Sequence, residues 1–225
     1  MEINFTHHQT AHCENGVVSN LMKHNGFKVS EPMVFGIGSG LLFCHIPFLK
    51  VNQAPAVTYR VMPGQIFKRF AKRTGIKIKK EKFKSPKQAK DRLDENLKKD
   101  NPVGLQVGVY NLTYFPDEYR FHFNAHNLIV YGKENDNYLI SDPVMETVTT
   151  LTSKELEKVR FAKGAFAPNG HMYYPIDFPK ELDIKTAIVK GIKNTCRDML
   201  APVPIVGIKG IRYTAKLIRK WPKSK

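Results

Sequence analysis

The hydrophobic period of this sequence changes near residue 102, and that change limits the folds available to the chain. Before it, apolar residues recur at helical spacing, which predicts helices at 14–25, at 65–74 and from Ser85-Pro86 to Asn101-Pro102. After it, apolar and aromatic residues alternate with polar ones, which predicts strands at 103–109, 119–123, 127–131, 138–141, 147–151 and 172–176. Helices followed by an antiparallel sheet are typical of an α+β fold.

The last part of the chain is predicted to be helical again. Thr152 and Glu155 form a capping box for a short helix, and a longer helix is expected from Asp183. Residues 205–221 read as an amphipathic, basic segment. We therefore expect a main domain over residues 1–178 and a basic helical extension over residues 179–225. No window of about 18 uncharged apolar residues exists, so no membrane-spanning helix is expected.

The positive charge of the chain is concentrated in two segments. The formal net charge is +16. Residues 68–100 hold 14 Lys and Arg against 5 Asp and Glu, and residues 180–225 hold 12 against 3, which gives +9 for each segment. Clustered positive charge favours an acidic protein, an anionic membrane surface or nucleic acid as partner, or serves solubility alone. No helix-turn-helix, RNP-type or zinc-finger pattern is present, which makes nucleic acid the least favoured partner.

The cysteines and the N-terminus indicate a reducing compartment. Cys13, Cys44 and Cys196 are odd in number and far apart, which argues against a disulfide framework. Residues 1–8 lack a basic region followed by an apolar stretch, so no signal peptide is expected and the predicted location is the cytoplasm, with peripheral attachment to the inner membrane left open. Cys44 lies in an apolar run beside His45, and Cys196 lies on the apolar side of a predicted basic helix, so both are expected to be buried and inert.

Cys13 is the strongest candidate for a catalytic group. It stands just ahead of an apolar stretch at helical spacing that ends at Gly26. A cysteine at a helix N-terminus lies near unpaired backbone N–H groups and the positive end of the helix dipole, and both favour the thiolate. The histidines 7, 8 and 12 close to it are not accompanied by a Cys-x-x-Cys or His-Glu-x-x-His pattern, so no metal site is predicted.

His126 and Asp142 are the matching candidates for base and base-orienting carboxylate. His126 opens a predicted strand, and Asp142 follows the next one, 16 residues later. Two adjacent antiparallel strands would return Asp142 to the side of His126. Cysteine, then histidine, then carboxylate is the chain order of papain-like cysteine enzymes. Each residue alone is more often structural, so the prediction rests on the three together.

Three further residues are weaker site candidates. Gln9 or the region of His12 would supply a second donor to an oxyanion hole, beside the backbone N–H of Cys13. Glu31 is either a carboxylate near Cys13 or a loop residue. The glycine-rich stretch 36–40 lacks the Gly-Lys-Ser/Thr ending of a phosphate loop, so close backbone packing is expected there. The apolar residues that follow, at 41–43, 46 and 48, are expected in the core, with an acyl pocket as the alternative.

Several motifs in order resemble one known family. They are His12-Cys13-Glu14, Gly26, Ser30-Glu31, residues 35–40, residues 126–132 and Ser141-Asp142-Pro143. Together they resemble the N-terminal domain of the butirosin biosynthesis protein H family over roughly residues 5–175. The stretch after that looks like the start of the helical C-terminal domain often found in these proteins, but it is short here.

The resemblance implies a papain-like α+β fold, related to C39-like cysteine peptidases, and an acyltransferase activity. An acyl group would move from an acidic acyl-carrier protein to Cys13 and then to an amine acceptor, a small molecule or a lipid. The resemblance implies no bound cofactor, because the phosphopantetheine arm of the carrier belongs to the substrate. By matching position Cys13 bears the thioester, His126 is the base and Asp142 orients it. A cysteine hydrolase, peptidase or amidase, would use the same three residues and is the main alternative.

Overall fold

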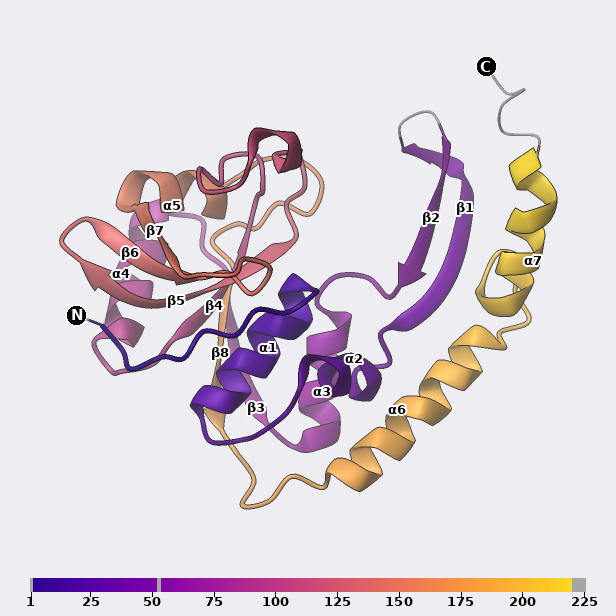
Figure 1. Ribbon diagram of the computed structural model, residues 1–225, viewed down its shortest axis with the longest axis horizontal. Helices are drawn as coiled ribbons and strands as arrows, with labels where there is room; N and C mark the ends of the chain where they lie inside the picture. Colours follow the sequence, from indigo (N-terminus) through magenta and orange to yellow (C-terminus); the bar gives the residue numbers. More distant parts are fainter. Residues whose placement is uncertain (1, 52–53, 220–225) are drawn as a thin grey trace. The chain divides into compact units, whose positions relative to one another are not determined.

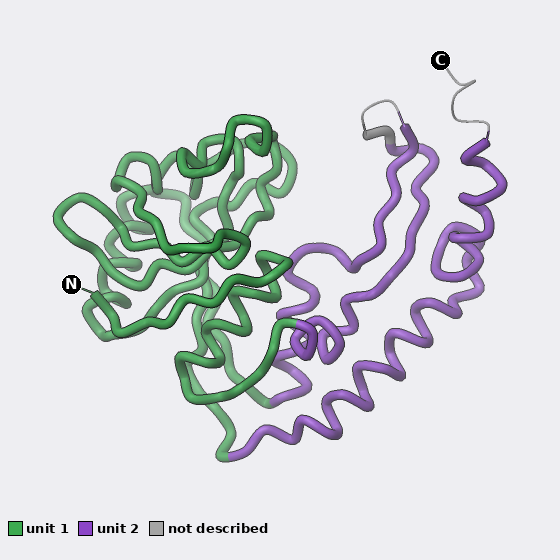
Figure 2. Tube along the Cα trace, viewed as in Figure 1, with its two compact units in different colours: residues 1–31, 75–180 green, residues 32–74, 181–225 purple. Residues whose placement is uncertain are grey.

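The chain forms two compact units, each built from two separate stretches of sequence. The computed structural model describes residues 2–51 and 54–219 (Figure 1). The first unit comprises residues 1–31 and 75–180, and the second comprises residues 32–74 and 181–225 (Figure 2). These units differ from the division expected at residue 178, because residues 32–74 group with the C-terminal segment.

A six-stranded sheet forms the centre of the first unit. Its strands lie in the order β3-β8-β4-β5-β6-β7, and every neighbouring pair is antiparallel. The bounds are β3 Lys77–Glu81, β4 Val103–Val107, β5 His126–Glu134, β6 Asn137–Ser141, β7 Thr149–Thr152 and β8 Met172–Asp177. The central strands are buried along most of their length, as expected for a sheet with covered faces.

Three helices pack on this sheet. They are α1 Cys13–His24, α4 Pro86–Leu97 and α5 Ser153–Arg160, and a short 3₁₀ turn spans Asp117–Tyr119. Helix α1 contacts β4 and β5, and α4 contacts the same two strands, while α5 packs on β4, β6 and β7. The core holds large apolar side chains from α4, α5 and five of the strands, among them Leu93, Leu105, Leu128, Ile140 and Leu156.

Local sequence signals determine where two of these helices begin. The Ser85 side chain accepts a hydrogen bond from the Gln88 backbone, and Pro86 occupies the first turn of α4. At α5, Thr152 and Glu155 form the predicted capping box. Both signals satisfy backbone N–H groups that a helix start leaves without an intrahelical partner.

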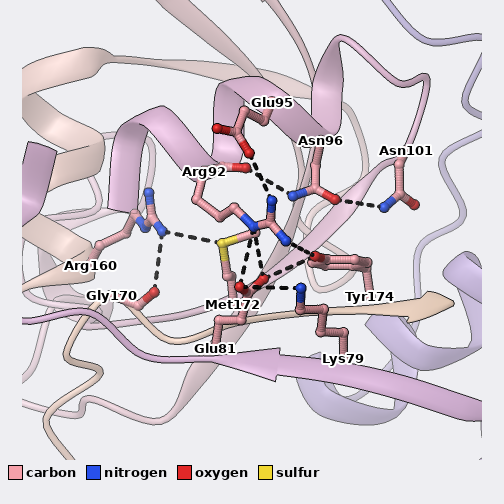
Figure 3. A network of polar contacts seen from close by, with 10 residues as sticks. All are labelled: Lys79, Glu81, Arg92, Glu95, Asn96, Asn101, Arg160, Gly170, Met172 and Tyr174. Atoms are coloured by element: carbon pink, nitrogen blue, oxygen red, sulfur yellow. Dashed lines mark hydrogen bonds and ion pairs between the residues drawn. The ribbon is translucent and has the colours of Figure 1, made fainter. Parts of the chain in front are cut away.

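A polar network fastens α4 to the edge of the sheet. Nε of Arg92 lies 3.2 Å from a carboxylate oxygen of Glu81 on β3, and Nη1 lies 2.7 Å from Glu95 (Figure 3). The Tyr174 hydroxyl on β8 donates to Glu81 at 2.9 Å. Nearby, the buried guanidinium of Arg160 donates to the carbonyls of Ala89 and Gly170. These contacts join helix, edge strand and loop around charges that are otherwise costly to bury.

The second unit combines a hairpin with four helices. Its elements are α2 Glu31–Ile37, β1 Leu41–Val51, β2 Ala54–Arg60, α3 Gln65–Thr74, α6 Ile184–Met199 and α7 Gly207–Leu217. The first residue of α2, Glu31, belongs to the first unit. Helix α6 contacts α3 and β1, and α7 packs on β1. Gly191 of α6 meets the end of α2 so closely that an added Cβ would lie 2.5 Å from the Gly36 carbonyl oxygen.

Most predicted elements are present, and several details differ from the expectation. The strand expected at 119–123 is wrong, since that segment holds the 3₁₀ turn and irregular backbone. Close packing in the glycine-rich stretch is confirmed at Gly38 and Gly40, whose added Cβ atoms would clash with Ile66 and with the Phe35 ring. Among the described residues, no helix has both the length and the apolar composition needed to cross a membrane.

The hairpin and one cysteine are more exposed than predicted. Leu41 and Phe48, expected in the core, are 43% and 84% exposed, because β1 and β2 form a sheet of two strands and, beyond it, β1 adds a bridge from Cys44 to Val206. A two-stranded ribbon lacks the neighbouring strands that would cover its faces. Cys196 is exposed on α6 rather than buried, and Cys44 on β1 is half-buried.

Candidate active site

Cys13 is the first residue of α1 and is 8% exposed. His12 precedes it with extended backbone and supplies no side-chain cap. The N–H groups of a first helical turn have no intrahelical partner, and in α1 that turn begins at the residue that bears the thiol. This location lets the helix terminus stabilise negative charge on the sulfur. It can also stabilise the oxygen of a carbonyl group that the sulfur attacks.

His126 and Asp142 meet at the ends of two paired strands. His126 opens β5, Asp142 directly follows β6, and Ile129 pairs with Ser141 between them. Nε2 of His126 lies 2.6 Å from Oδ2 of Asp142. The antiparallel pairing that the sequence suggested is therefore what joins two residues 16 positions apart.

The Asp142 carboxylate is held on both of its oxygens. Its side chain is fully buried. The Tyr114 hydroxyl donates to Oδ2 at 2.7 Å, and the Val144 backbone N–H donates to Oδ1 at 3.2 Å. Burial and the charge of Asp142 raise the pKa of Tyr114 well above its ordinary value, so this hydroxyl keeps its proton and acts as a donor. Donors on both oxygens keep the carboxylate in one orientation toward His126.

Cys13 and His126 shift each other's ionisation. Burial lowers the pKa of His126, but the charges of Asp142 and Cys13 outweigh it and raise the pKa to about 10. Burial raises the pKa of Cys13, but the charge and hydrogen bond of His126, with a backbone contact from Asn127, bring it below the ordinary value of 9.0. Opposite shifts of this kind favour a thiolate beside an imidazolium, which is the reactive form of a cysteine nucleophile.

Asn127 lies beside the sulfur as well. Its Nδ2 is 4.0 Å from Sγ of Cys13 and donates to the Ala125 carbonyl at 3.0 Å. The Tyr173 hydroxyl on β8 donates to Asn127 Oδ1 at 2.8 Å. Because the oxygen of the amide accepts from Tyr173, its nitrogen must face the other way, toward Cys13. Tyr173 thus determines which end of the Asn127 amide the sulfur meets.

The three weaker candidates are placed around the segment that leads into Cys13. The Glu31 carboxylate accepts a hydrogen bond from the Ala11 backbone N–H at 3.0 Å, so it holds this segment two residues before Cys13. His12 is the residue that precedes the helix. Gln9 is exposed, and no hydrogen bond of its side chain joins it to Cys13 within the described residues.

The sequence prediction did not include Asn127, Tyr173 or Tyr114. Neighbouring side chains of a strand point to opposite faces of the sheet. If His126 faces the site, this rule predicts that Asn127 faces away from it. The rule does not hold here, because His126 is the first residue of β5. The side chains of His126 and Asn127 both reach the Cys13 sulfur. Tyr173 and Tyr114 reach the site from 46 and 28 residues away from their partners, and no local pattern marks them.

His7 adds a further contact between the N-terminal segment and the end of β6. One ring nitrogen lies 2.8 Å from Oγ of Ser141, the residue before Asp142, and the other lies 3.1 Å from the Met145 carbonyl oxygen. The Thr10 backbone N–H also donates to the Pro143 carbonyl at 2.6 Å. The segment before Cys13 is therefore attached on both sides of Asp142.

Comparison with known proteins places this chain in a family. A family model described as butirosin biosynthesis protein H, N-terminal, matches residues 12–143, which is more than half of the chain. A second model, described only as a domain of unknown function (DUF4872), matches residues 154–225. A search of curated proteins gave no match.

Solved structures show what the fold resembles. A protein described as a C39-like peptidase from Bacillus anthracis has 14% identity and a TM-score of 0.54, over 80% of this chain and 100% of that one. The peptidase domain of Streptococcus ComA, a bi-functional ABC transporter involved in a quorum sensing pathway, has 15% identity and a TM-score of 0.48, over 79% and 100%. The first of these likenesses confirms the predicted papain-like α+β fold.

Proposed function

Because the chain belongs to the butirosin biosynthesis protein H family, with the fold of papain-like cysteine enzymes, we propose that it is an acyltransferase. The acyl donor is the thioester of an acyl-carrier protein, and the acceptor is an amine. Cys13 carries the acyl group between them. The observation that carries this proposal is the buried contact of Cys13, His126 and Asp142, with its opposed pKa shifts.

The first half-reaction exchanges one thioester for another. The Cys13 thiolate attacks the carbonyl carbon of the donor, and the backbone N–H groups at the start of α1 stabilise the oxygen that becomes negative. The C–S bond to the phosphopantetheine arm then breaks. The His126 imidazolium gives its proton to the departing thiolate, so the carrier leaves as a thiol, Cys13 holds the acyl group and the imidazole is neutral.

The second half-reaction releases the product and restores the starting charges. The acceptor amine attacks the carbonyl carbon of the acyl-enzyme and transfers a proton to His126. The bond to the Cys13 sulfur breaks, the amide leaves, and the thiolate–imidazolium pair forms again. Asp142, held by Tyr114 and the Val144 backbone, stabilises the imidazolium with which the cycle begins and ends.

The choice of a carrier protein as donor is supported by charge. The net charge of +16 lies mainly in two segments, and an acidic partner would be attracted to them. The family description names a biosynthetic protein, which favours transfer to an acceptor over simple hydrolysis. The proposal includes a lipid amine as acceptor. An anionic membrane surface that binds the basic C-terminal segment would bring such a lipid within reach.

Intact-protein mass spectrometry tests the covalent step. Wild type and Cys13→Ala are incubated with a set of acyl-carrier thioesters, and the mass of each protein is measured. An adduct on wild type that is absent from Cys13→Ala supports the thioester intermediate, and its mass identifies the acyl group. No adduct with any donor, on folded protein, would contradict the proposal.

The fate of the adduct separates transfer from hydrolysis. The acylated protein is freed of donor and divided between buffer alone and buffer with candidate amines. A transferase holds the acyl group in buffer and releases it as an amide when the right amine is added. Rapid loss to water in both portions would instead assign a cysteine hydrolase with the same three residues.

A further inference from the structure

The second unit contains a cavity lined almost entirely by cations. Its volume is about 580 Å³, and the helices α3 and α6 that form it are in contact. Besides Asn194, it is lined by three basic residues from each helix: Arg69, Lys72 and Arg73 from α3, and Lys190, Lys193 and Arg197 from α6. On α6 the three cations follow one another at intervals of three and four residues, and on α3 Lys72 and Arg73 lie three and four residues after Arg69, so each set shares one side of its helix.

The two arginines of α3 are held by the last residue of α2 and by Ser39 just after it. Nη1 of Arg69 donates to the Ser39 carbonyl at 3.1 Å. Nη1 of Arg73 donates to the Ile37 carbonyl and to Oγ of Ser39. Ser39 in turn donates to the Gly191 carbonyl of α6 at 2.9 Å. These contacts give the guanidinium groups defined positions before any ligand arrives, which lowers the entropic cost of binding.

The positive charges of the cavity exceed the negative charges described around them. Asp198 lies 3.5 Å from Arg69 and is the acidic residue that pairs with this group. Arg197 donates to the Asn194 side chain, which is neutral. Burial, together with the charges of Arg69 and Arg197, lowers the pKa of Arg73, as expected where cations crowd one another. Six cations with one such carboxylate favour a bound anion that carries more than one charge.

We infer that this cavity is a binding site for a soluble ligand with two linked phosphate groups. Guanidinium groups match the oxygens of a phosphate in pairs, and lysines add charge without fixed geometry. Cations on two facing helices can contact both phosphates of a diphosphate, whereas a single phosphate reaches fewer of them. The cavity is built only from residues of the second unit, so its ligand does not depend on the chemistry proposed at Cys13.

Calorimetric titration with inorganic pyrophosphate tests the inference. The test variant is Lys72→Gln with Lys193→Gln, because both side chains line the cavity and are exposed, which limits the effect on folding. The matched control is Lys68→Gln with Lys185→Gln, which makes the same change of charge on the same two helices but at residues that do not line the cavity. Ionic strength is held constant with sodium chloride, since screening weakens exposed ion pairs.

We expect pyrophosphate to bind wild type, and the test variant to bind it about tenfold more weakly through the loss of two ion pairs. The dissociation constant of the control variant for pyrophosphate should stay within about twofold of the wild-type value. Orthophosphate should bind wild type at least about tenfold more weakly than pyrophosphate, because one phosphate contacts fewer of the cations. Equal loss in test and control would show only a general effect of charge and would overturn the inference. So would lysine-dependent binding to vesicles of phosphatidylcholine and phosphatidylglycerol without pyrophosphate binding, because the ligand would then be a membrane surface.

Discussion

Removal of the Asn127 side-chain amide should raise the pKa of Cys13 without changing the reactivity of the thiolate itself. The Nδ2 of Asn127 lies 4.0 Å from Sγ, which is long for a hydrogen bond, so the lower end of the range for bonds to charged groups applies, about 1.5 kcal/mol. Since one pKa unit corresponds to about 1.4 kcal/mol, Asn127→Ala should raise the pKa of Cys13 by about one unit. The direction follows because a donor stabilises the thiolate and its loss favours the thiol.

The assay is the rate of Cys13 alkylation by iodoacetamide across a range of pH. Peptide mapping by mass spectrometry separates Cys13 from the exposed Cys196 and the half-buried Cys44. Below the wild-type pKa the variant should react about tenfold more slowly, and well above both pKa values the two rates should converge. Asn101→Ala removes an amide that donates to Asn96 elsewhere in the same unit, and it should leave the profile of Cys13 unchanged.

Tyr173→Phe provides an independent check on the same reasoning. The variant keeps the Asn127 amide but removes the hydroxyl that donates to its oxygen, so the amide is free to turn. We expect a smaller rise in the pKa of Cys13 than in Asn127→Ala. An unchanged profile in Asn127→Ala, or a rate lowered equally at every pH, would refute the idea that the amide stabilises the thiolate.

Three further predictions concern the site and the two units. The rate of Cys13 acylation should rise as pH passes the lowered pKa of Cys13 and fall near pH 10 as His126 loses its proton, and a pH profile that rises through pH 10 would contradict the thiolate–imidazolium pair. Gly191→Ala should destabilise the second unit by about 1–3 kcal/mol, because the new Cβ would lie 2.5 Å from the Gly36 carbonyl oxygen; Gly36→Ala, where an added Cβ meets nothing, is its control in urea denaturation. Arg160→Met should cost about 2–4 kcal/mol in the same measurement, because two carbonyls lose their donor in a buried site, whereas the exposed Lys154→Met should change little.

Local sequence signals predicted the parts of the fold that depend on neighbouring residues. The starts of α4 and α5 follow from Ser85-Pro86 and from the Thr152–Glu155 capping box, which act within one turn of chain. The antiparallel pairing of β5 and β6 followed from two alternating stretches separated by a short turn. That pairing is also why the sequence alone predicts His126 and Asp142 as partners.

The sequence could not predict which residues are buried by elements that lie far away in the chain. The apolar composition of residues 41–48 predicted a core segment, but burial depends on what else packs there, and Phe48 lies on an exposed two-stranded ribbon. Cys196 was expected on the apolar side of its helix, at four residues from Ile192, and is nevertheless exposed on α6. Periodicity describes one element and carries no information about which face a partner covers.

The amino-acid sequence by itself determined the α+β class, a helix directly after Cys13 and the order of Cys13, His126 and Asp142, because each depends on short-range pattern or on chain order. Tertiary structure decided which side chains surround the sulfur. Tyr173 reaches Asn127 from 46 residues away, and Tyr114 reaches Asp142 from 28 residues away. Tertiary structure also brought cations from two separate basic segments into one cavity between α3 and α6. In both places the deciding distances are set by packing of elements far apart in the chain, which no local pattern encodes.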